Sequence, residues 1–206
     1  MNTYILGLGG FAKEVFEQII LQEQYDLNKP FAGFITYDKN KLLLDGKDFK
    51  EAQKETDEFI LATGIKKHRS VFINSLLVEY GCSKANFPNY FAKTARVAEM
   101  ATLGYGNLFC DFSLVNANAV IRNFNCFNAY SSTYHDTLVG SHNILSPYSA
   151  LLGNVRIGDK NFLGAGATIT PLVEIGDNNT LSAGEYLFDD MDDNQFFRSG
   201  IISNKP

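Results

Sequence analysis

IGDKNFLGAGATITP, residues 157–171, carries a large apolar residue at every sixth position, at Ile157, Leu163 and Ile169. The same spacing extends in both directions along the chain. Its sixteen positions are Val97, Leu103, Phe109, Val115, Ile121, Phe127, Thr133, Val139, Leu145, Leu151, Ile157, Leu163, Ile169, Ile175, Leu181 and Leu187. All except Thr133 are apolar. A strict period of six is typical of hexapeptide repeats and cannot come from amphipathic helices.

The other positions of the hexad fit a parallel β-helix. The fourth residue after each apolar anchor is mostly small or short, and the residue directly after it is often glycine. Each hexad then forms a short strand and a corner, and three hexads complete one coil with the anchors on its axis. Sixteen hexads predict about five coils. The repeat is expected to decay at residues 188–193, FDDMDD, before a C-terminal tail.

The first 84 residues follow a different pattern, in which strands and helices alternate. Apolar strands are expected at residues 4–6, 31–35 and 58–62, and helices at 11–24 and 66–80. This order predicts a small parallel sheet with packed helices. The predicted fold is therefore an α/β Rossmann-like domain, residues 1–84, followed by an all-β hexapeptide-repeat domain, residues 85–206.

Composition and charge exclude several classes of protein. The net charge of −5 and the pI of about 5.2 argue against a nucleic-acid partner. No run of about 18 apolar residues is present, so no membrane span is expected. The N-terminus has no basic, apolar leader pattern, and the three cysteines show no CxxC spacing. A cytoplasmic protein with reduced cysteines is expected.

With these features, nearly the whole chain resembles a family of bacterial sugar acyltransferases. The motifs that carry the resemblance are GLGGFAKEV at residues 7–15, ATG at 62–64, YHD at 134–136 and the run at 157–171. The family includes the UDP-4-amino-sugar N-acetyltransferases of the bacillosamine pathway, perosamine-type and dTDP-4-amino-4,6-dideoxyglucose N-acetyltransferases, and sialic acid O-acetyltransferases. The resemblance implies a left-handed coil and a homotrimer with active sites between subunits.

The glycine-rich segment GLGGFA at residues 7–12 lies between a strand and a helix, where backbone N–H groups can approach a phosphate. A nicotinamide cofactor is the usual interpretation, but the domain has only about three alternating units. The resemblance implies a nucleotide sugar instead, with its diphosphate at the glycines and its base near Asp38. A turn that only joins strand to helix is the structural alternative. The substrate residues implied are Gly7, Gly9, Gly10, Phe11, Asp38, Gly64 and Asn128.

Of the three histidines, His135 is the candidate catalytic residue, because it lies within a hexad and beside an acid. The resemblance implies that His135 is the general base, that Asp136 orients its ring, and that the Gly153 amide binds the oxyanion. His68 and His142 are expected to be exposed. A γ-class carbonic anhydrase shares the coil but requires three histidine ligands, so no metal is expected.

Acetyl-CoA is the implied co-substrate, bound by the backbone at Gly153, Ala165 and Ala183. Three departures from the family pattern concern this ligand and the start of the coils. Ile144 stands where relatives often carry a second histidine, residues 89–91 read NYF where relatives often read IHP, and GIIS at 200–203 replaces a terminal GxPA.

The resemblance thus implies acetyl transfer from acetyl-CoA to the C4 amine of a UDP- or dTDP-linked 4-amino-4,6-dideoxy sugar, in O-antigen or surface-glycan biosynthesis. The amine attacks the thioester directly, because Cys110 and Cys126 have no anchored base. Two alternatives stay open: O-acetylation of a sialic acid or glycan hydroxyl, and a non-catalytic trimeric scaffold.

Overall fold

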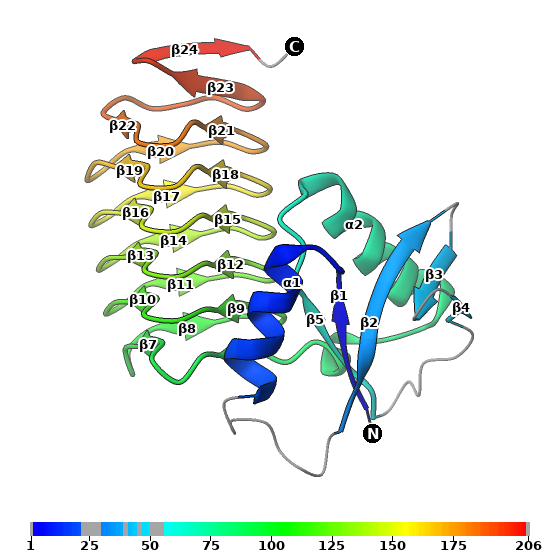
Figure 1. The fold of residues 1–206 in the computed structure, drawn as a ribbon. Coiled ribbons are helices and arrows are strands. Elements are labelled where there is room, and N and C mark those ends of the chain that lie inside the picture. Colours follow the sequence, from blue (N-terminus) through cyan, green and yellow to red (C-terminus); the bar gives the residue numbers. More distant parts are fainter. Residues whose placement is uncertain (1, 22–29, 39–40, 45–46, 50–55, 205–206) are drawn as a thin grey trace. The chain divides into compact units, whose positions relative to one another are not determined.

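The computed structural model describes residues 2–21, 30–38, 41–44, 47–49 and 56–204. The chain divides into two compact units, Met1–Lys93 and Thr94–Pro206 (Figure 1). This division falls after Lys93, later in the chain than the boundary at residue 84 expected from the sequence.

The first unit contains one five-stranded sheet in the order β4-β3-β2-β1-β5. Its strands are β1 (Thr3–Leu6), β2 (Phe31–Asp38), β3 (Lys41–Leu44), β4 (Lys47–Asp48) and β5 (Glu58–Leu61). As expected, β1, β2 and β5 are parallel. However, β3 and β4 are antiparallel additions that the alternating pattern did not predict. The sheet is therefore mixed, and smaller than a doubly wound one.

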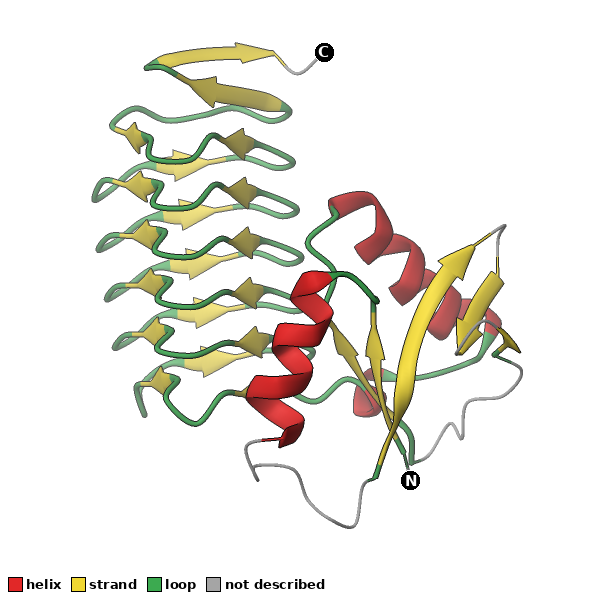
Figure 2. Cartoon of the chain, in the orientation of Figure 1, coloured by secondary structure: helices red, strands yellow, loops and turns green. Residues whose placement is uncertain are grey.

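Two helical segments follow β1 and β5 (Figure 2). Both segments change from α to π geometry along their length. The segments are α1 (Gly10–Val15) with η1 (Phe16–Leu21), and α2 (Lys66–Asn74) with η2 (Ser75–Glu79). Residues 22–24, where the sequence predicts the end of the first helix, lie outside the described residues. Gly81, with φ of 64°, follows the second segment, as the sequence predicted. The unit ends with η3 (Lys84–Asn86) and β6 (Tyr90–Phe91).

The second unit is a parallel β-helix of two-residue strands, each ending on a predicted anchor. They are β7 (Arg96–Val97), β8 (Thr102–Leu103), β9 (Leu108–Phe109), β10 (Leu114–Val115), β11 (Val120–Ile121), β12 (Cys126–Phe127), β13 (Ser132–Thr133), β14 (Leu138–Val139), β15 (Ile144–Leu145), β16 (Ala150–Leu151), β17 (Arg156–Ile157), β18 (Phe162–Leu163), β19 (Thr168–Ile169), β20 (Glu174–Ile175), β21 (Thr180–Leu181) and β22 (Tyr186–Leu187). Every third strand pairs in parallel, which forms three sheets. One is β7-β10-β13-β16-β19-β22, the next is β8-β11-β14-β17-β20, and the third runs through β9, β12, β15, β18 and β21.

The β-helix continues beyond residues 188–193, where the sequence predicted the decay of the repeat, and it has about six turns. Met191 bridges to Ile175, and β23 (Gln195–Arg198) pairs in parallel with β21. In a regular turn the paired residues are eighteen apart, as Phe162 and Thr180 are. In the last turn Thr180 pairs with Phe196, so this turn has only sixteen residues. Because this turn is two residues shorter, the six-residue spacing of the anchors does not continue through it, and the sequence pattern did not predict it. The expected tail forms β24 (Ile201–Asn204), antiparallel to β23.

The anchors fill the axis of the coil, and most are fully buried. Thr133, the polar anchor, is also fully buried. Asparagines stack beside them at one position of each coil, and these are Asn107, Asn125, Asn143, Asn161 and Asn179. The side-chain oxygen of each of the first four accepts the N–H of the asparagine one coil further on, as Asn125 Oδ1 does from Asn143 at 2.9 Å, and Asn179 Oδ1 accepts the N–H of Gln195 at 2.6 Å. This ladder satisfies buried backbone groups inside the coil.

The corners between strands form three edges of a prism. The His135 edge holds Ala117, His135, Gly153 and Pro171; the Asp177 edge holds Asn123, Ser141, Asp159, Asp177 and Asp193; the Ala165 edge holds Ala129, Pro147, Ala165 and Ala183. The residue after each of these usually has φ near +60°. These positions define where the candidate functional groups lie.

Candidate functional site

His135 and Asp136 form a corner between β13 and β14, and their side chains meet. The distance between His135 Nδ1 and Asp136 Oδ2 is 2.9 Å. Neighbouring residues in a strand point to opposite faces, but Asp136 has φ of 58°, which the corner requires and aspartate tolerates. The two side chains are 57% and 46% exposed. The corner therefore provides an imidazole–carboxylate pair that is open to solvent.

The contact with Asp136 selects the tautomer of the neutral imidazole. An ionised carboxylate only accepts hydrogen bonds, so in the neutral ring Nδ1 carries the hydrogen and donates it to Asp136. The lone pair then lies on Nε2. A Cβ atom placed on Gly153 would lie 2.6 Å from both Nε2 and Cε1 of His135. Gly153, on the next coil of the same edge, is therefore required for the close approach of the ring.

Asp136 is held at both of its oxygens. Its Oδ1 accepts a hydrogen bond from Asn118 Nδ2 at 3.1 Å, from the preceding coil of the His135 edge. The hydrogen bonds from His135 and from Asn118 lower the pKa of the Asp136 carboxyl below its ordinary value of 3.8. Sequence reasoning did not identify Asn118. Its position, eighteen residues before Asp136, is one coil away and could have identified it.

Backbone N–H groups are free at three predicted positions. The amides of Gly153, Ala165 and Ala183 donate no hydrogen bond within the described residues. By contrast, the Ala129 N–H donates to Asn128 Oδ1 at 2.7 Å. Asn128 therefore lies on the Ala165 edge with its side-chain oxygen already used, which leaves its NH₂ group for a ligand.

The predicted residues of the β-helix do not all come together within one chain. His135, Asp136 and Gly153 share the His135 edge, whereas Ala165 and Ala183 lie on the Ala165 edge. Strand β19 connects these edges, because it begins after the corner at Ala165 and ends before the corner at Pro171. One face of the prism thus separates the imidazole from the two free amides.

In the first unit, the fold requires glycine at some positions of the glycine-rich segments after β1 and β5 and not at others. Gly7 has φ of 133°, and a Cβ atom there would lie 2.6 Å from the Ala62 carbonyl oxygen, so this glycine is structural. Gly9 has φ of −70°. A Cβ atom on Gly9, Gly10 or Gly64 would meet nothing within 4 Å. The fold therefore gives no reason for these three glycines, which leave bare backbone at the ends of two neighbouring parallel strands, β1 and β5.

Two other substrate candidates are located by the sheet and by α1. Strand β2 extends to Asp38, which pairs with Lys41 of β3. The expectation that this strand ends at Ile35 was wrong, because the hairpin with β3 prolongs it. Asp38 is the last residue of β2 and is exposed, while Phe11 in the first turn of α1 is half-buried.

The other histidines and the cysteines lie in different environments. His68 is exposed, as expected. His142 is half-buried and stacks on Phe124 with ring centroids 5.1 Å apart, which corrects the expected exposure. All three cysteines lie among the described residues, are buried and form no disulfide. Among the described residues, no group of three His, Cys, Asp or Glu side chains could hold a metal ion.

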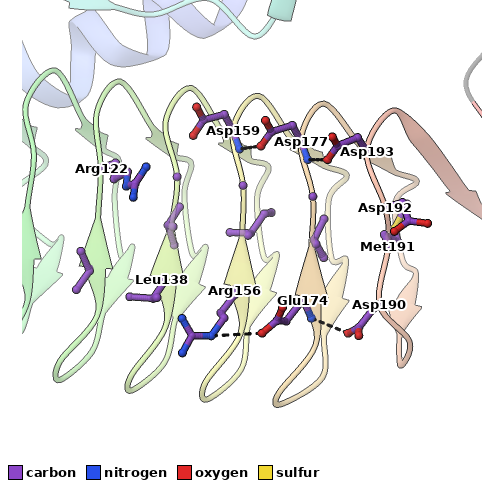
Figure 3. A pocket seen from close by; sticks show the side chains of 17 residues that line it. Arg122, Leu138, Arg156, Asp159, Glu174, Asp177, Asp190, Met191, Asp192 and Asp193 are labelled. Atoms are coloured by element: carbon purple, nitrogen blue, oxygen red, sulfur yellow. Dashed lines mark hydrogen bonds and ion pairs between the residues drawn. The ribbon is translucent and has the colours of Figure 1, made fainter.

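A groove of about 910 Å³ lies on the sheet of β11, β14, β17 and β20 (Figure 3). No predicted site residue lines it. Its floor includes Gly140, Gly158 and Gly176, where a Cβ atom would collide with an aspartate Oδ1 from the next coil. These aspartates accept backbone N–H groups, as Asp177 Oδ1 does from Asp159 at 2.7 Å. These three glycines and the aspartates that approach them thus have a structural explanation.

Comparison with known proteins defines the fold. No family model and no curated protein matches the sequence. Among solved structures, PerB from Caulobacter crescentus, in complex with CoA and GDP-perosamine, is 24% identical with a TM-score of 0.79, over 98% of this chain and 97% of PerB. The acetyltransferase domain of PglB from Neisseria gonorrhoeae is 21% identical with a TM-score of 0.79, over 99% of both chains. That domain has also been solved with acetyl coenzyme A.

A mutant of perosamine N-acetyltransferase from Caulobacter crescentus, also with CoA and GDP-perosamine, is 22% identical with a TM-score of 0.72, over 100% of this chain and 97% of the enzyme. The resemblance to sugar N-acetyltransferases stated from the sequence is therefore confirmed at the level of the fold. No helix among the described residues is long and apolar enough to cross a membrane.

Proposed function

We propose that this protein transfers an acetyl group from acetyl-CoA to the amine of a nucleotide-linked amino sugar. The observation that carries the proposal is the His135 corner. It presents an imidazole whose Nδ1 is held by Asp136, and it brings the ring close to Gly153, whose backbone N–H donates no hydrogen bond within the described residues. This pair of groups occurs in a fold shared with an acetyltransferase domain and a perosamine N-acetyltransferase.

His135 acts as the general base. Its Nε2 accepts a proton from the C4 ammonium of the sugar, so that the nitrogen can attack the thioester carbonyl. The Gly153 N–H donates to the carbonyl oxygen as that oxygen gains negative charge. The tetrahedral intermediate then breaks its C–S bond and releases CoA as a thiolate, which takes up the proton held by His135, while the second amine proton passes to solvent. The described cysteines are buried, which supports direct attack by the amine over a covalent enzyme intermediate.

The proposed acceptor is a UDP- or dTDP-linked 4-amino-4,6-dideoxy sugar bound by the first unit. Its diphosphate lies against the bare backbone at Gly9, Gly10 and Gly64, where no side chain fills the space. Gly7 and Phe11 shape this turn, Asp38 lies near the base, and Asn128 contributes its NH₂ group to the acceptor pocket. Pantetheine amides pair with the free backbone at Ala165 and Ala183.

The proposed assembly is a trimer with active sites between chains. Its support is the separation of the His135 edge from the Ala165 edge within one chain. A neighbouring chain that presents its Ala165 edge to the His135 edge brings the acetyl donor to the imidazole.

The test is CoA release with a panel of acceptors. The panel contains UDP-, dTDP- and GDP-linked 4-amino sugars, with sialic acid and 4-hydroxy sugars as controls. We expect release with one 4-amino sugar and none with the corresponding 4-hydroxy sugar. Release only with hydroxyl acceptors would show an O-acetyltransferase. Failure to bind acetyl-CoA in calorimetry would favour a scaffold.

A further inference from the structure

The geometry of the His135 edge assigns a positioning role to a residue beyond the proposed catalytic pair, and this inference rests on the proposed function. We propose that the side-chain amide of Asn118 fixes the Asp136 carboxylate, and thereby the tautomer and orientation of the His135 ring. The chain of contacts runs from Asn118 Nδ2 to Asp136 Oδ1 at 3.1 Å, and from Asp136 Oδ2 to His135 Nδ1 at 2.9 Å.

Exposure explains why the carboxylate needs a second contact. A hydrogen bond between two exposed side chains is weak, because water competes for both groups and each side chain loses rotamer freedom. Asp136 is 46% exposed and His135 is 57% exposed. The Asn118 contact is also exposed, but a carboxylate held at both oxygens has less rotational freedom than one held at Oδ2 alone, and its Oδ2 therefore stays directed at His135 Nδ1.

The backbone of the coil places Asn118 in the required position. Asn118 and Asp136 occupy the same corner position in successive coils, with φ of 57° and 58°. The Asp136 N–H donates to the Ala117 carbonyl oxygen at 3.1 Å, which connects the two corners. Asparagine adopts this backbone conformation at low cost and also supplies an N–H donor that reaches one coil onward.

The chain offers a matched control on another edge. Asn178 has φ of 58°, and its Nδ2 donates to Asn194 Oδ1 of the next turn at 2.8 Å. This contact also joins two corner residues with left-handed backbone on successive turns, and its acceptor Asn194 is not adjacent to a histidine in the chain. Glycine is the appropriate replacement at both positions, because it removes the amide and keeps the left-handed backbone without strain.

The experiment measures the His135 tautomer by ¹⁵N NMR of the imidazole in wild-type, Asn118→Gly and Asn178→Gly proteins. The His135→Ala spectrum assigns the signals. We expect mainly Nδ1–H in the wild type and in Asn178→Gly, and a mixture with Nε2–H in Asn118→Gly. An unchanged tautomer in Asn118→Gly overturns the proposal. This readout needs no substrate, so it stands even if the proposed reaction is wrong.

Kinetics provide the second readout. For Asn118→Gly we expect kcat to fall roughly five- to tenfold, the usual effect of one lost hydrogen bond, with the KM of both substrates unchanged. In an Asp136→Asn background, Asn118→Gly should cause no further loss, because both act through the same carboxylate. An equal loss of kcat in Asn178→Gly, or full additivity with Asp136→Asn, would overturn the positioning role.

Discussion

The two ring nitrogens of His135 have different environments, and this difference is the basis of its proposed role. Nδ1 faces the Asp136 carboxylate, whereas Nε2 lies close to Gly153, where only a residue without a side chain allows the ring to approach. The pKa of Asp136 is lowered, so its carboxyl group stays ionised at every pH above its ordinary value of 3.8. Any loss of turnover between pH 5 and 8 therefore has a cause other than protonation of Asp136.

Replacement of the imidazole tests this role directly. For His135→Ala we expect turnover to fall by about 10²–10⁴, the usual cost of removing a positioned general base. Calorimetry should still show binding of acetyl-CoA and of the sugar, because neither binding surface is removed. His68→Ala, which changes an exposed histidine of α2, is the control and should retain full activity. Near-wild-type turnover in His135→Ala would exclude it as the base.

At the scale of the element, the turn after β1 contains two kinds of glycine: Gly7 is required by the fold, and Gly9 is proposed to face the ligand. For Gly7→Ala we expect a loss of about 1–3 kcal/mol of stability, because φ is 133° and the new Cβ would meet the Ala62 carbonyl oxygen. For Gly9→Val we expect native far-UV CD and thermal stability, because φ is −70° and the space is open.

Kinetics of Gly9→Val then locate the ligands. Because the valine side chain fills the proposed position of the diphosphate, the KM for the nucleotide sugar should rise strongly. The KM for acetyl-CoA should not change. The opposite pattern, in which only acetyl-CoA is affected, would show that the ligands are assigned to the wrong units.

The asparagine ladder is the element that stabilises the interior of the coils. Asn143 accepts from the Asn161 N–H at 2.8 Å and donates to the Gly158 carbonyl oxygen at 2.9 Å, and it is fully buried. Asn143→Ala leaves these groups unpaired, so we expect a loss of about 1–3 kcal/mol for each in urea unfolding. Asn178→Gly, at a half-buried corner, should cost less. Equal losses would contradict the structural role of the ladder.

At the scale of the whole molecule, the sequence predicted those features that repeat with a local period. The period of six located every strand from β7 to β22, because each anchor must face the axis. It did not locate the sixth turn, because two residues are missing between Thr180 and Phe196 and the bridge at Met191 replaces a strand. The hairpin of β3 and β4 was missed because the alternating pattern located only parallel strands.

The candidate site was predictable only in part, because some of its contacts join residues on successive coils. His135 and Asp136 are adjacent in the chain, so the sequence could identify the pair. The contact of Asp136 with Asn118 and the close approach of His135 to Gly153 each join two corners on successive coils. The residues in each pair are eighteen positions apart in the chain. That relation becomes visible only when the hexads are grouped into coils of three.

The proposed intersubunit site predicts both a mass and a pattern of complementation. Light scattering should give about three times 22.9 kDa. Ala165→Pro with Ala183→Pro removes two free amides of the Ala165 edge, and the corner tolerates proline because Pro147 occupies the same position one coil earlier. This variant should lose acetyl-CoA affinity and keep its stability, whereas His135→Ala should bind acetyl-CoA without turnover.

Co-expression of these two inactive variants then decides where the site lies. If each site takes its imidazole from one chain and its Ala165 edge from the next, random assembly restores about a quarter of the sites of a closed trimer. Mixing the purified proteins without subunit exchange is the control and should give no activity. A site contained within one chain predicts that the co-expressed mixture stays as inactive as its parents, because no chain then carries both intact edges.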